Sequence, residues 1–430
     1  MTDGISAVHT APLVLPMTED PIVDGAVALA GDRIVLVGTR DEVLGAVPAA
    51  RVREWPGVLL PGLVNAHAHL EYSDFADLAT SGLDFPAWLR AVTARRTTFT
   101  TAQWLESSRR GIHAMLRTGT TCAADIVTHG PGLRAAAMAG LAGVSYLECV
   151  GIDASDWPEE RARLERELAA PTQVRALGIS PHAPYTLGVG VFRDLVALAR
   201  EAGVRLHPHV AETAAEVEFV RDGTGPLAQP AREGKTRDHE LRGVGCALSP
   251  VAYVDSLDGL GPDVHVAHGV HVDAADRALL REHGTAVVLC VRSNAVLDAG
   301  TPPVADYLAE GNVLAVGTDS LASSPSLDLI EELAALRAVA VAQGAPDAGL
   351  AERLLRLATV GGAAALGLAG ECGVLAPGAR ADLAVFDVAV DGSPYDALLD
   401  AGAGRCIATV LGGKLVHRRA PDASPPGGAS

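Results

Sequence analysis

The sequence predicts an α/β protein: a (β/α)8 TIM barrel that carries a small composite β-sandwich built from both chain ends. Short apolar runs alternate with alanine-rich, helix-like stretches through the middle of the chain, which is the pattern of a parallel barrel. Both ends instead contain short strands separated by turns. The length of 430 residues fits a barrel of about 250 residues plus one smaller module. A doubly wound sheet is the alternative, but no G-x-G-x-x-G follows a first strand.

The two ends of the chain are predicted to form one β module. Residues 27–37 place two apolar runs around Gly31 and Asp32, which is a hairpin signal. Residues 374–416 have the same pattern, with a pair of glycines at a turn. Independent terminal modules are the alternative. We expect four segments: residues 1–56 and 368–418 in the β-sandwich, 57–367 in the barrel, and 419–430 as a flexible tail.

Eight apolar runs are expected to be the barrel strands. Helix-like segments lie between them, such as residues 85–117, 191–202 and 274–282, and a last one covers 326–341. A glycine- and charge-rich stretch, residues 223–245, is predicted to be a loop inserted after the fifth strand. The expected strands are residues 58–66, 121–125, 143–150, 174–180, 204–210, 264–268, 286–291 and 313–317.

Composition excludes several classes of function. The 34 basic residues are outnumbered by 52 acidic ones, so the net charge of −18 repels nucleic acid and anionic membranes. Aromatic residues make up only 4% of the chain, which disfavours platforms for stacking bases. The six cysteines are scattered without a C-x-x-C pair, which argues against a disulfide framework and a zinc knuckle. No signal peptide or membrane-spanning run is apparent, so we expect a soluble, cytoplasmic protein that acts on a small molecule.

Histidines gather at the ends of two expected strands. The first strand ends in NAHAHL, and residues two apart on a strand share one face, so His67 and His69 can reach a single metal ion. The fifth strand ends in LHPHVAET, where His209 precedes Glu212 by three residues. His207 shares the strand face of His209 one layer deeper, and is interpreted as a buried core histidine.

Two further strand ends carry residues of the same kind. The sixth strand offers His268, while the nearby His265 and His271 are expected to pack or to support it. The eighth strand ends in AVGTDS and offers Asp319, although an aspartate there can also cap a helix. Because barrel enzymes place active sites at the C-terminal ends of their strands, these positions favour one shared site.

The segments PGLVNAHAHL, HPHVAET, AHGVH and GTDS together resemble the amidohydrolase superfamily, and most closely its mononuclear deaminase branch. The resemblance covers nearly the whole chain, including GVLAPGARADLAVFD near the C-terminus. It implies that the chain is an enzyme of the aminohydrolase type, acting on C–N bonds of cyclic amidines. The implied metal ligands are His67, His69, His209 and Asp319, and the implied catalytic residues are Glu212, His268 and Asp319.

The lysine content selects a subclass within this resemblance. Related binuclear enzymes bridge two metals with a carbamylated lysine at the end of the fourth strand. That strand here ends in GISPHAPYT, and the only lysines of the chain are Lys235 and Lys414. One divalent ion is therefore expected, with Zn2+ as the first choice and Fe2+ also suited to three imidazoles and a carboxylate.

The implied reaction is hydrolytic deamination of an aminated heterocycle. Zinc lowers the pKa of bound water from about 15.7 to roughly 7, so that hydroxide attacks the amidine carbon at neutral pH. Glu212 is expected to protonate the adjacent ring nitrogen. His268 and Asp319 are expected to take the proton of the water, and Asp319 to return it to the departing ammonia.

Three residues are expected to contact the substrate besides Glu212: Glu71, Trp88 and His182. Glu71 lies two residues beyond His69 in HLEYS, with a structural salt bridge as the alternative. Related S-adenosylhomocysteine and methylthioadenosine deaminases carry a glutamate just before the tryptophan, but this chain has Ala87, which weakens those two substrates. His182 matches a family histidine that contacts substrate, with a core role as the alternative.

The run H-x-H-L-E-Y-S resembles the aminodeoxyfutalosine deaminases of menaquinone biosynthesis, which convert 6-amino-6-deoxyfutalosine to futalosine. That substrate bears a benzoate, so an arginine is expected opposite its carboxylate, and Arg95, Arg96 and Arg292 are the candidates. Arg292-Ser293-Asn294 also departs from the Ser-His-Asn of relatives. The alternatives are deaminases of adenosine, S-adenosylhomocysteine, methylthioadenosine or guanine, a chlorohydrolase or cyclic amidohydrolase, and a metal-free scaffold. Members of the family often dimerise, so a homodimer is also expected.

Overall fold

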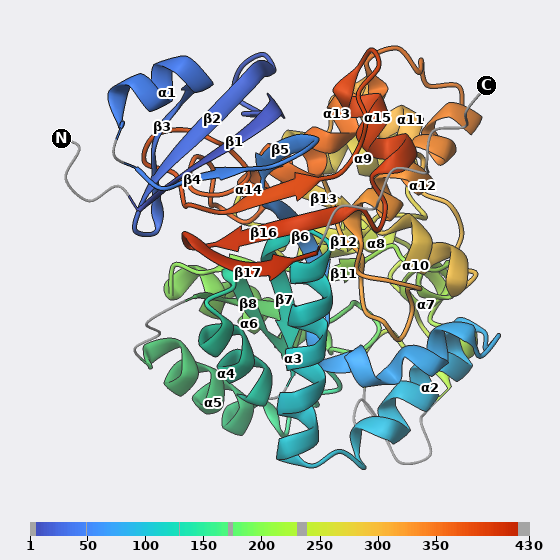
Figure 1. Ribbon diagram of the computed structural model, residues 1–430. Coiled ribbons are helices and arrows are strands. Elements are labelled where there is room, and N and C mark those ends of the chain that lie inside the picture. The colour runs from blue at the N-terminus through green and yellow to red at the C-terminus, as the bar shows by residue number, and fades with distance from the viewer. Residues whose placement is uncertain (1–5, 49, 129, 171–174, 230–238, 420–430) are drawn as a thin grey trace.

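The terminal segments form one mixed sheet in the computed structural model, which describes residues 6–48, 50–128, 130–170, 175–229 and 239–419 (Figure 1). Strands from both chain ends pair directly, because β5 runs antiparallel to β15 and parallel to β1. The predicted composite β module is therefore confirmed. Lys235 and the predicted tail beyond residue 419 lie outside the described residues. The sheet order is β17-β16-β15-β5-β1-β2-β3, and β4 pairs with β1. Its strands are β1 (Ala7–Val14), β2 (Ile22–Ala30), β3 (Arg33–Thr39), β4 (Val52–Glu54), β5 (Val58–Pro61), β15 (Leu383–Phe386), β16 (Cys406–Leu411) and β17 (Lys414–Arg418).

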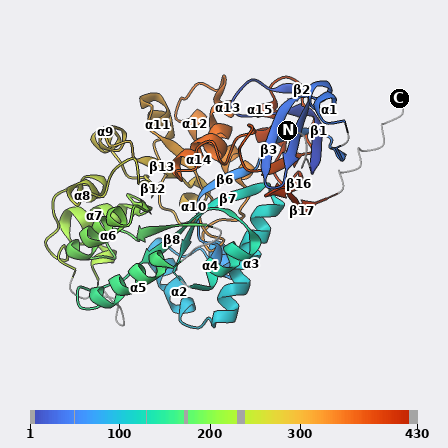
Figure 2. The same ribbon diagram turned by 90° about the vertical axis from the view of Figure 1, so that its left-hand side faces the viewer.

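The middle of the chain forms the predicted parallel barrel. One arc of the barrel has the strand order β10-β9-β8-β7-β6 and the other has β11-β12-β13-β14. The two arcs close where the amide of Asp319, just beyond β14, donates to the carbonyl of His67 in β6 at 3.0 Å. Figure 2 shows the terminal strands gathered on one side of this barrel and α6, α7 and α8 on the opposite side. The barrel strands are β6 (Leu63–Ala68), β7 (Thr120–Val127), β8 (Ala142–Cys149), β9 (Ala176–Pro181), β10 (Arg205–Leu206), β11 (His209–Val210), β12 (His265–His268), β13 (Ala286–Leu289) and β14 (Leu314–Val316).

Two expected strands are interrupted. The apolar run 58–66 divides at Gly62, so that β5 joins the terminal sheet and only β6 enters the barrel. A β-carbon at Gly62 would collide with the side chain of Thr121, so glycine allows the chain to cross closely between the two sheets. The fifth barrel strand is broken at residues 207–208, where Pro208 cannot donate a ladder hydrogen bond.

The helices cover the outside of the barrel, as predicted. The expected helical stretch 85–117 is two helices, because Thr100 starts a new helix with a capping box closed by Gln103. The helices are α1 (Arg40–Ala46), α2 (Phe85–Arg96), α3 (Thr101–Arg117), α4 (Gly130–Ala139), α5 (Trp157–Ala169), α6 (Val189–Glu201), α7 (Ala214–Asp222), α8 (Pro250–Ser256), α9 (Ala274–Glu282), α10 (Val291–Val296), α11 (Val304–Glu310), α12 (Leu329–Ala342), α13 (Leu350–Arg356), α14 (Gly362–Ala365) and α15 (Pro394–Ala401). The other helical segments are the 3-10 helices η1 (Leu70–Thr80) and η2 (Pro226–Ala228) and the π-helix η3 (Leu357–Gly361).

Apolar side chains fill two main layers. The largest cluster joins the barrel wall to its helices, with Phe192, Phe219 and Leu333 completely buried, and a separate cluster lies within the terminal sheet. Burial of this extent stabilises the barrel frame that carries the strand ends. Within the described part of the chain, no helix is both long and apolar enough to cross a bilayer.

Candidate metal centre and its cavity

The ends of β6 and β11 bring three histidines together. His67 lies in β6, His69 follows its last residue, and His209 begins β11. The Nε2 atoms of His69 and His209 are 3.2 Å apart, and the ring centroids of His67 and His209 are 4.8 Å apart. All three side chains are buried. The strand periodicity that predicted a common face for His67 and His69 thus places both rings at one point.

Asp319 approaches the same point from the end of β14. Its Oδ1 atom lies 3.6 Å from Nε2 of His67 and 3.7 Å from Nε2 of His69. The other oxygen, Oδ2, accepts hydrogen bonds from the hydroxyls of Ser293 at 2.6 Å and Ser323 at 2.9 Å. These two hydroxyls fix the carboxylate so that Oδ1 faces the histidines.

The backbone at three strand ends is in an uncommon conformation. Ala211, His268 and Asp319 have φ values of 57°, 78° and 60°, in the left-handed region that non-glycine residues rarely adopt. Such strain persists only where surrounding contacts hold it, and it is concentrated at functional sites. At Ala211 the contact is the carboxylate of Glu216, which accepts from the amides of Ala211 at 2.9 Å and Glu212 at 2.8 Å.

Hydrogen bonds to carbonyl oxygens fix the tautomers of two imidazoles. His207 donates from Nδ1 to the carbonyl of His265 at 2.7 Å, so in its neutral form its Nε2 accepts from Nδ1 of His67 at 2.8 Å. His209 likewise donates from Nδ1 to the carbonyl of His182 at 3.0 Å. The Nε2 lone pairs of His67 and His209 therefore both face the cluster.

The chemistry of this donor set fits a divalent cation. The Nε2 atom of His67 is buried and has no hydrogen-bond partner among the described residues. Burial, together with the nearby His67, lowers the pKa of His69 to about 4, so this imidazole is neutral at pH 7. His67, His69 and Asp319 offer ligand atoms within 4.8 Å of one another, as do His67, His209 and His268. Neutral imidazoles and one carboxylate are ligands that suit Zn2+ or Fe2+.

Glu212 and His268 lie beside this cluster. The Oε1 atom of Glu212 is 3.5 Å from Nε2 of His268, and both groups have ligand atoms within 4.8 Å of Asp319. Burial, with the carboxylates of Asp319 and Glu216 nearby, raises the pKa of Glu212 well above its usual value. The amide nitrogen of Asn294 lies 3.2 Å from Nδ1 of His268 and holds that ring in place.

A cavity opens directly above the cluster. Trp88 and His182, both predicted to contact substrate, line it, and Trp88 is anchored by donating from Nε1 to the carbonyl of Ala322 at 2.8 Å. Glu71 is not among the described residues that line this cavity; its carboxylate instead accepts from the amide of Thr128 at 3.1 Å. Its role as a substrate contact stays a prediction that the geometry does not favour. The other lining residues are His69, Tyr72, Phe85, Leu89, Val92, Thr93, Arg96, Glu148, Val150, Tyr185, His209, Glu212, His268, Asp319 and Ser320.

One of the three candidate arginines, Arg96, faces the cavity. Arg95 pairs with Asp77 and Arg292 pairs with Glu331, so the charges of both are already neutralised. No described carboxylate lies within 4 Å of the Arg96 guanidinium, whose central carbon is 5.9 Å from the Tyr72 ring.

The cavity adjoins a second chamber of about 410 Å³. Arg96, Glu148 and Val150 line both spaces and so mark their junction. Farther out, Arg163 is held by Glu160 at 2.6 Å and by Glu167 at 2.9 Å. A ligand whose reacting end lies at the histidines therefore has polar space for a long substituent.

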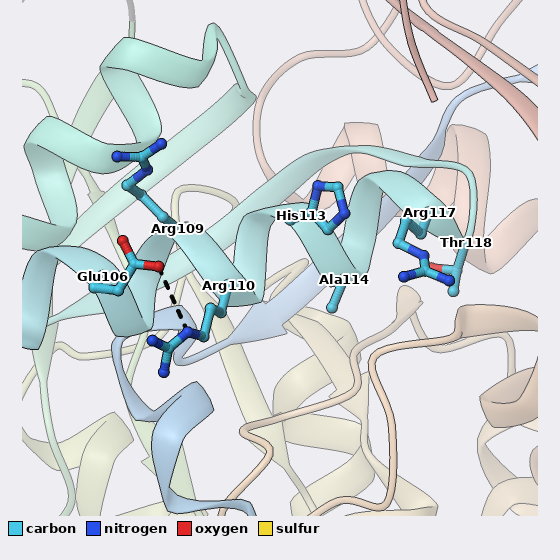
Figure 3. A pocket seen from close by; sticks show the side chains of 7 residues that line it. All are labelled: Glu106, Arg109, Arg110, His113, Ala114, Arg117 and Thr118. Atoms are coloured by element: carbon cyan, nitrogen blue, oxygen red, sulfur yellow. Dashed lines mark ion pairs between the residues drawn. The ribbon is translucent and has the colours of Figure 1, made fainter. Parts of the chain in front are cut away.

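A different hollow lies on the outer face of α3 (Figure 3). Its described lining residues come from α3 and from Thr118, which directly follows the helix, and they include Arg109, Arg110, His113 and Arg117. Arg110 is paired with Glu106 at 3.5 Å and with Asp74 at 2.6 Å. Among the described residues, this hollow has no group of convergent buried ligand atoms like that of the barrel site, which is therefore the better candidate.

Sequence reasoning missed several residues that support the site. Ser293 and Asn294 follow β13 in the tripeptide Arg292-Ser293-Asn294. Their position just beyond the end of a barrel strand could have identified them as site residues. Glu148 near the end of β8 gave the same signal. Glu216, four residues beyond Glu212, could be recognised only once the turn had folded.

Comparisons with known proteins agree with the fold and the site. The family model described as "Amidohydrolase family" matches residues 58–416. A protein of Halobacterium salinarum named 5-methylthioadenosine/S-adenosylhomocysteine deaminase is 34% identical over 343 residues, which cover 77% of this chain and 73% of that protein.

Two solved structures share the fold. A zinc-bound adenosine deaminase from Xanthomonas campestris superposes with a TM-score of 0.81 at 24% identity, covering 96% of this chain and 93% of that one. Helicobacter pylori aminofutalosine deaminase, in complex with methylthio-coformycin, has a TM-score of 0.81 at 22% identity, covering 96% of this chain and all of that one. Because the family model spans the barrel and the C-terminal strands, well over half of the chain, this chain belongs to the amidohydrolase family.

Proposed function

We propose that this amidohydrolase-family enzyme is a metal-dependent hydrolytic deaminase of adenine-containing nucleosides. The single observation that carries the proposal is the convergence of three imidazoles and Asp319 beside Glu212, whose pKa is raised. A deaminase needs this combination, because water must be activated at the same place where a ring nitrogen receives a proton.

Four side chains of the cluster are the proposed metal ligands. His67, His69, His209 and Asp319 would hold one divalent ion, Zn2+ or Fe2+. When bound, the ion supplies Lewis-acid activation of the attacking water. No described lysine lies among the residues of the cluster, so a carbamate-bridged pair of ions is not part of the proposal.

The proton transfers belong to side chains of this chain. The raised pKa of Glu212 suits it to donate a proton to the ring nitrogen next to the amidine carbon, which makes that carbon electrophilic. His268 and Asp319 accept one proton of the attacking water, and Asp319 hands it to the departing amine, so that ammonia leaves. The second proton of the water leaves the new hydroxyl as the carbonyl forms and restores the carboxyl of Glu212. Asn294 and Ser293 keep the two acceptors oriented during these transfers.

The comparisons support nucleosides with a 5′-thioether over the predicted aminodeoxyfutalosine. The Halobacterium relative is named for methylthioadenosine and S-adenosylhomocysteine. The aminofutalosine deaminase is similar at 22% identity, a likeness that supports the fold alone. We therefore place methylthioadenosine and S-adenosylhomocysteine first. Arg96 and the chamber keep aminodeoxyfutalosine as a second candidate, because its benzoate and the carboxylate of S-adenosylhomocysteine would both need a cation. A role in menaquinone biosynthesis stays a prediction.

A substrate panel tests the proposal. The zinc-loaded protein is given methylthioadenosine, S-adenosylhomocysteine, adenosine, aminodeoxyfutalosine, guanine, a chlorotriazine and a cyclic imide, and ammonia, chloride and ring opening are measured. We expect ammonia from the adenine nucleosides, with the largest kcat/KM for the 5′-thioethers. Chloride release or ring opening as the main activity would contradict the proposal, and so would a protein that binds no metal and gains no activity when metal is added.

A further inference from the structure

Two hydrogen-bond acceptors face each other across the cavity without a donor between them. The Oε1 atom of Glu148 lies 4.0 Å from Nε2 of His182, beyond hydrogen-bonding distance. Both residues line the cavity beside His209, and one ligand atom of each lies within 4.8 Å of a His209 nitrogen. Neither residue has a proposed part in the proton transfers.

The hydrogen bonds of His182 leave its Nε2 as an acceptor. Its Nδ1 lies 3.0 Å from the hydroxyl oxygen of Thr186, and that hydroxyl donates its own hydrogen to the carbonyl of Ala183 at 3.1 Å. The bond at Nδ1 is therefore donated by the imidazole. In a neutral imidazole that donates from Nδ1, the other nitrogen Nε2 carries the lone pair, and His182 lines the cavity.

One carboxylate oxygen of Glu148, Oε2, accepts a hydrogen bond, and the other, Oε1, can accept one from a ligand. The hydroxyl of Thr128 donates to Oε2 at 2.7 Å, and the Thr128 oxygen accepts in turn from the hydroxyl of Tyr72 at 3.3 Å. Burial raises the pKa of Glu148, whereas the guanidinium of Arg96 and the hydroxyl of Thr128 lower it. Within the described residues, no donor lies within hydrogen-bonding distance of Oε1.

A second metal ion does not fit this acceptor pair. A third ligand would have to come from His209, but its Nδ1 donates to the carbonyl of His182 and its Nε2 faces His69 at 3.2 Å. Both ring nitrogens of His209 therefore already have other contacts and cannot bind a second ion. The pair is suited instead to a ligand that brings two donors close together.

We propose that Glu148 and His182 accept the two hydroxyl hydrogens of the ribose, and so select ribonucleosides over deoxyribonucleosides. This inference rests on the proposed function. In an adenine nucleoside whose 5′-hydroxyl is replaced, the ring nitrogens are acceptors and the 6-amino group is the one that leaves, so the 2′- and 3′-hydroxyls are the donors that remain on the base and the ribose. Two adjacent hydroxyls match two acceptors 4.0 Å apart.

The position of Glu148 agrees with this assignment. It lies at the junction of the cavity and the chamber, between the space beside the histidines and the space lined by Arg163. The ribose is the middle part of a 5′-substituted nucleoside. With the base at the metal cluster, the sugar reaches the junction and the 5′-substituent enters the chamber.

The test compares sugars on zinc-loaded variants. For wild type, we expect kcat/KM for methylthioadenosine to exceed that for its 2′-deoxy and 3′-deoxy analogues by at least about tenfold, since a site built to bind a hydroxyl rejects a ligand that lacks it. Glu148→Ala should reduce this ratio to within about threefold, mainly by lowering kcat/KM for the ribonucleoside. Glu160→Ala is the matched control, because it removes a carboxylate of the chamber wall away from the junction, and the ratio should persist.

The possible outcomes distinguish a failure of the ribose assignment from a failure of the proposed deaminase function. Equal kcat/KM of the wild type for ribo- and deoxynucleosides would overturn the inference while leaving the deaminase intact, and this comparison needs no variant to fold. A ratio that persists in both Glu148→Ala and Glu148→Gln would overturn it as well. Absence of deamination of every nucleoside would overturn the function and the inference together. Two bound ions in the wild type, with one lost in Glu148→Ala, would show that the acceptor pair is a metal site.

Discussion

Nδ1 of His67 lies 2.8 Å from Nε2 of His207, and this hydrogen bond decides which nitrogen of His67 faces the metal cluster. His207 is fixed by its own bond to the carbonyl of His265. A histidine that the sequence suggested to be a core residue is therefore a positioning residue for a candidate metal ligand. Such outer contacts orient metal ligands and raise their basicity.

Replacing His207 should weaken metal binding without touching a ligand. His207→Phe removes the acceptor for His67, so we expect the Kd for Zn2+ to rise about 10–100-fold. His207→Gln can accept from His67 and donate to the His265 carbonyl, and should restore most of the affinity. Chelator competition on the metal-free protein measures both values. Equal affinities of the Phe and Gln variants would show that His207 only fills space.

Glu212→Gln should separate metal binding from catalysis. Glutamine cannot donate a carboxyl proton to the ring nitrogen, so kcat should fall by about 10²–10⁴. The metal content should stay at the wild-type value, because Glu212 is not among the four proposed ligands. Steady-state ammonia release measures kcat, and elemental analysis of the same sample measures the metal content. A near-normal kcat would remove Glu212 from the mechanism.

Arg96 should discriminate between anionic and neutral 5′-substituents. Arg96→Met should raise KM for S-adenosylhomocysteine about tenfold or more and change KM for methylthioadenosine much less, because only the former bears a carboxylate. Arg95→Met is the matched control, since Arg95 is already paired with Asp77 outside the cavity. If both substrates lose affinity equally in Arg96→Met, the guanidinium contributes only to packing.

The terminal sheet should lose stability as the pH falls through the titration range of His9. Burial and the nearby Arg53 lower the pKa of this histidine to about 4, and Trp55 donates to its Nδ1 at 3.0 Å. Between pH 6.5 and about 4 the unfolded chain binds a proton that the native chain does not, so the free energy of unfolding decreases as pH falls. The full loss is on the order of 3 kcal/mol.

Denaturant unfolding at several pH values measures this effect. His9→Gln keeps an acceptor for Trp55 but does not titrate, so its stability should fall less steeply than that of the wild type over this range. Parallel curves for the two proteins would mean that His9 is not the group responsible.

The strand ends could be predicted from the sequence because their pattern is local. Because side chains alternate along a strand, His67 and His69 could be predicted to share one face. Because active sites of barrels lie at the C-terminal ends of the strands, Asp319 could be predicted to lie near them. The position of the Glu71 side chain could not be predicted from strand alternation. The helical turn η1 begins at Leu70, so the strand alternation that governs His69 no longer applies one residue later.

Contacts between distant segments could not be predicted in the same way. The bond of Asp319 to Ser323 is local, but its bond to Ser293 joins two different strand ends. The pairing of β5 with β15 spans most of the chain, and only the folded sheet shows that residues 58–61 belong to it. Such pairings depend on how the whole barrel closes rather than on any short pattern.

Equilibrium metal binding tests the central claim most directly. Metal-free wild type is titrated with Zn2+ in the presence of a competing chelator, beside His209→Ala, Asp319→Ala and, as a control outside the cluster, His271→Ala. We predict one ion per chain for the wild type and the control, and an affinity lower by at least about 100-fold in the other two variants. Wild-type affinity in His209→Ala and Asp319→Ala would contradict the proposed metal centre.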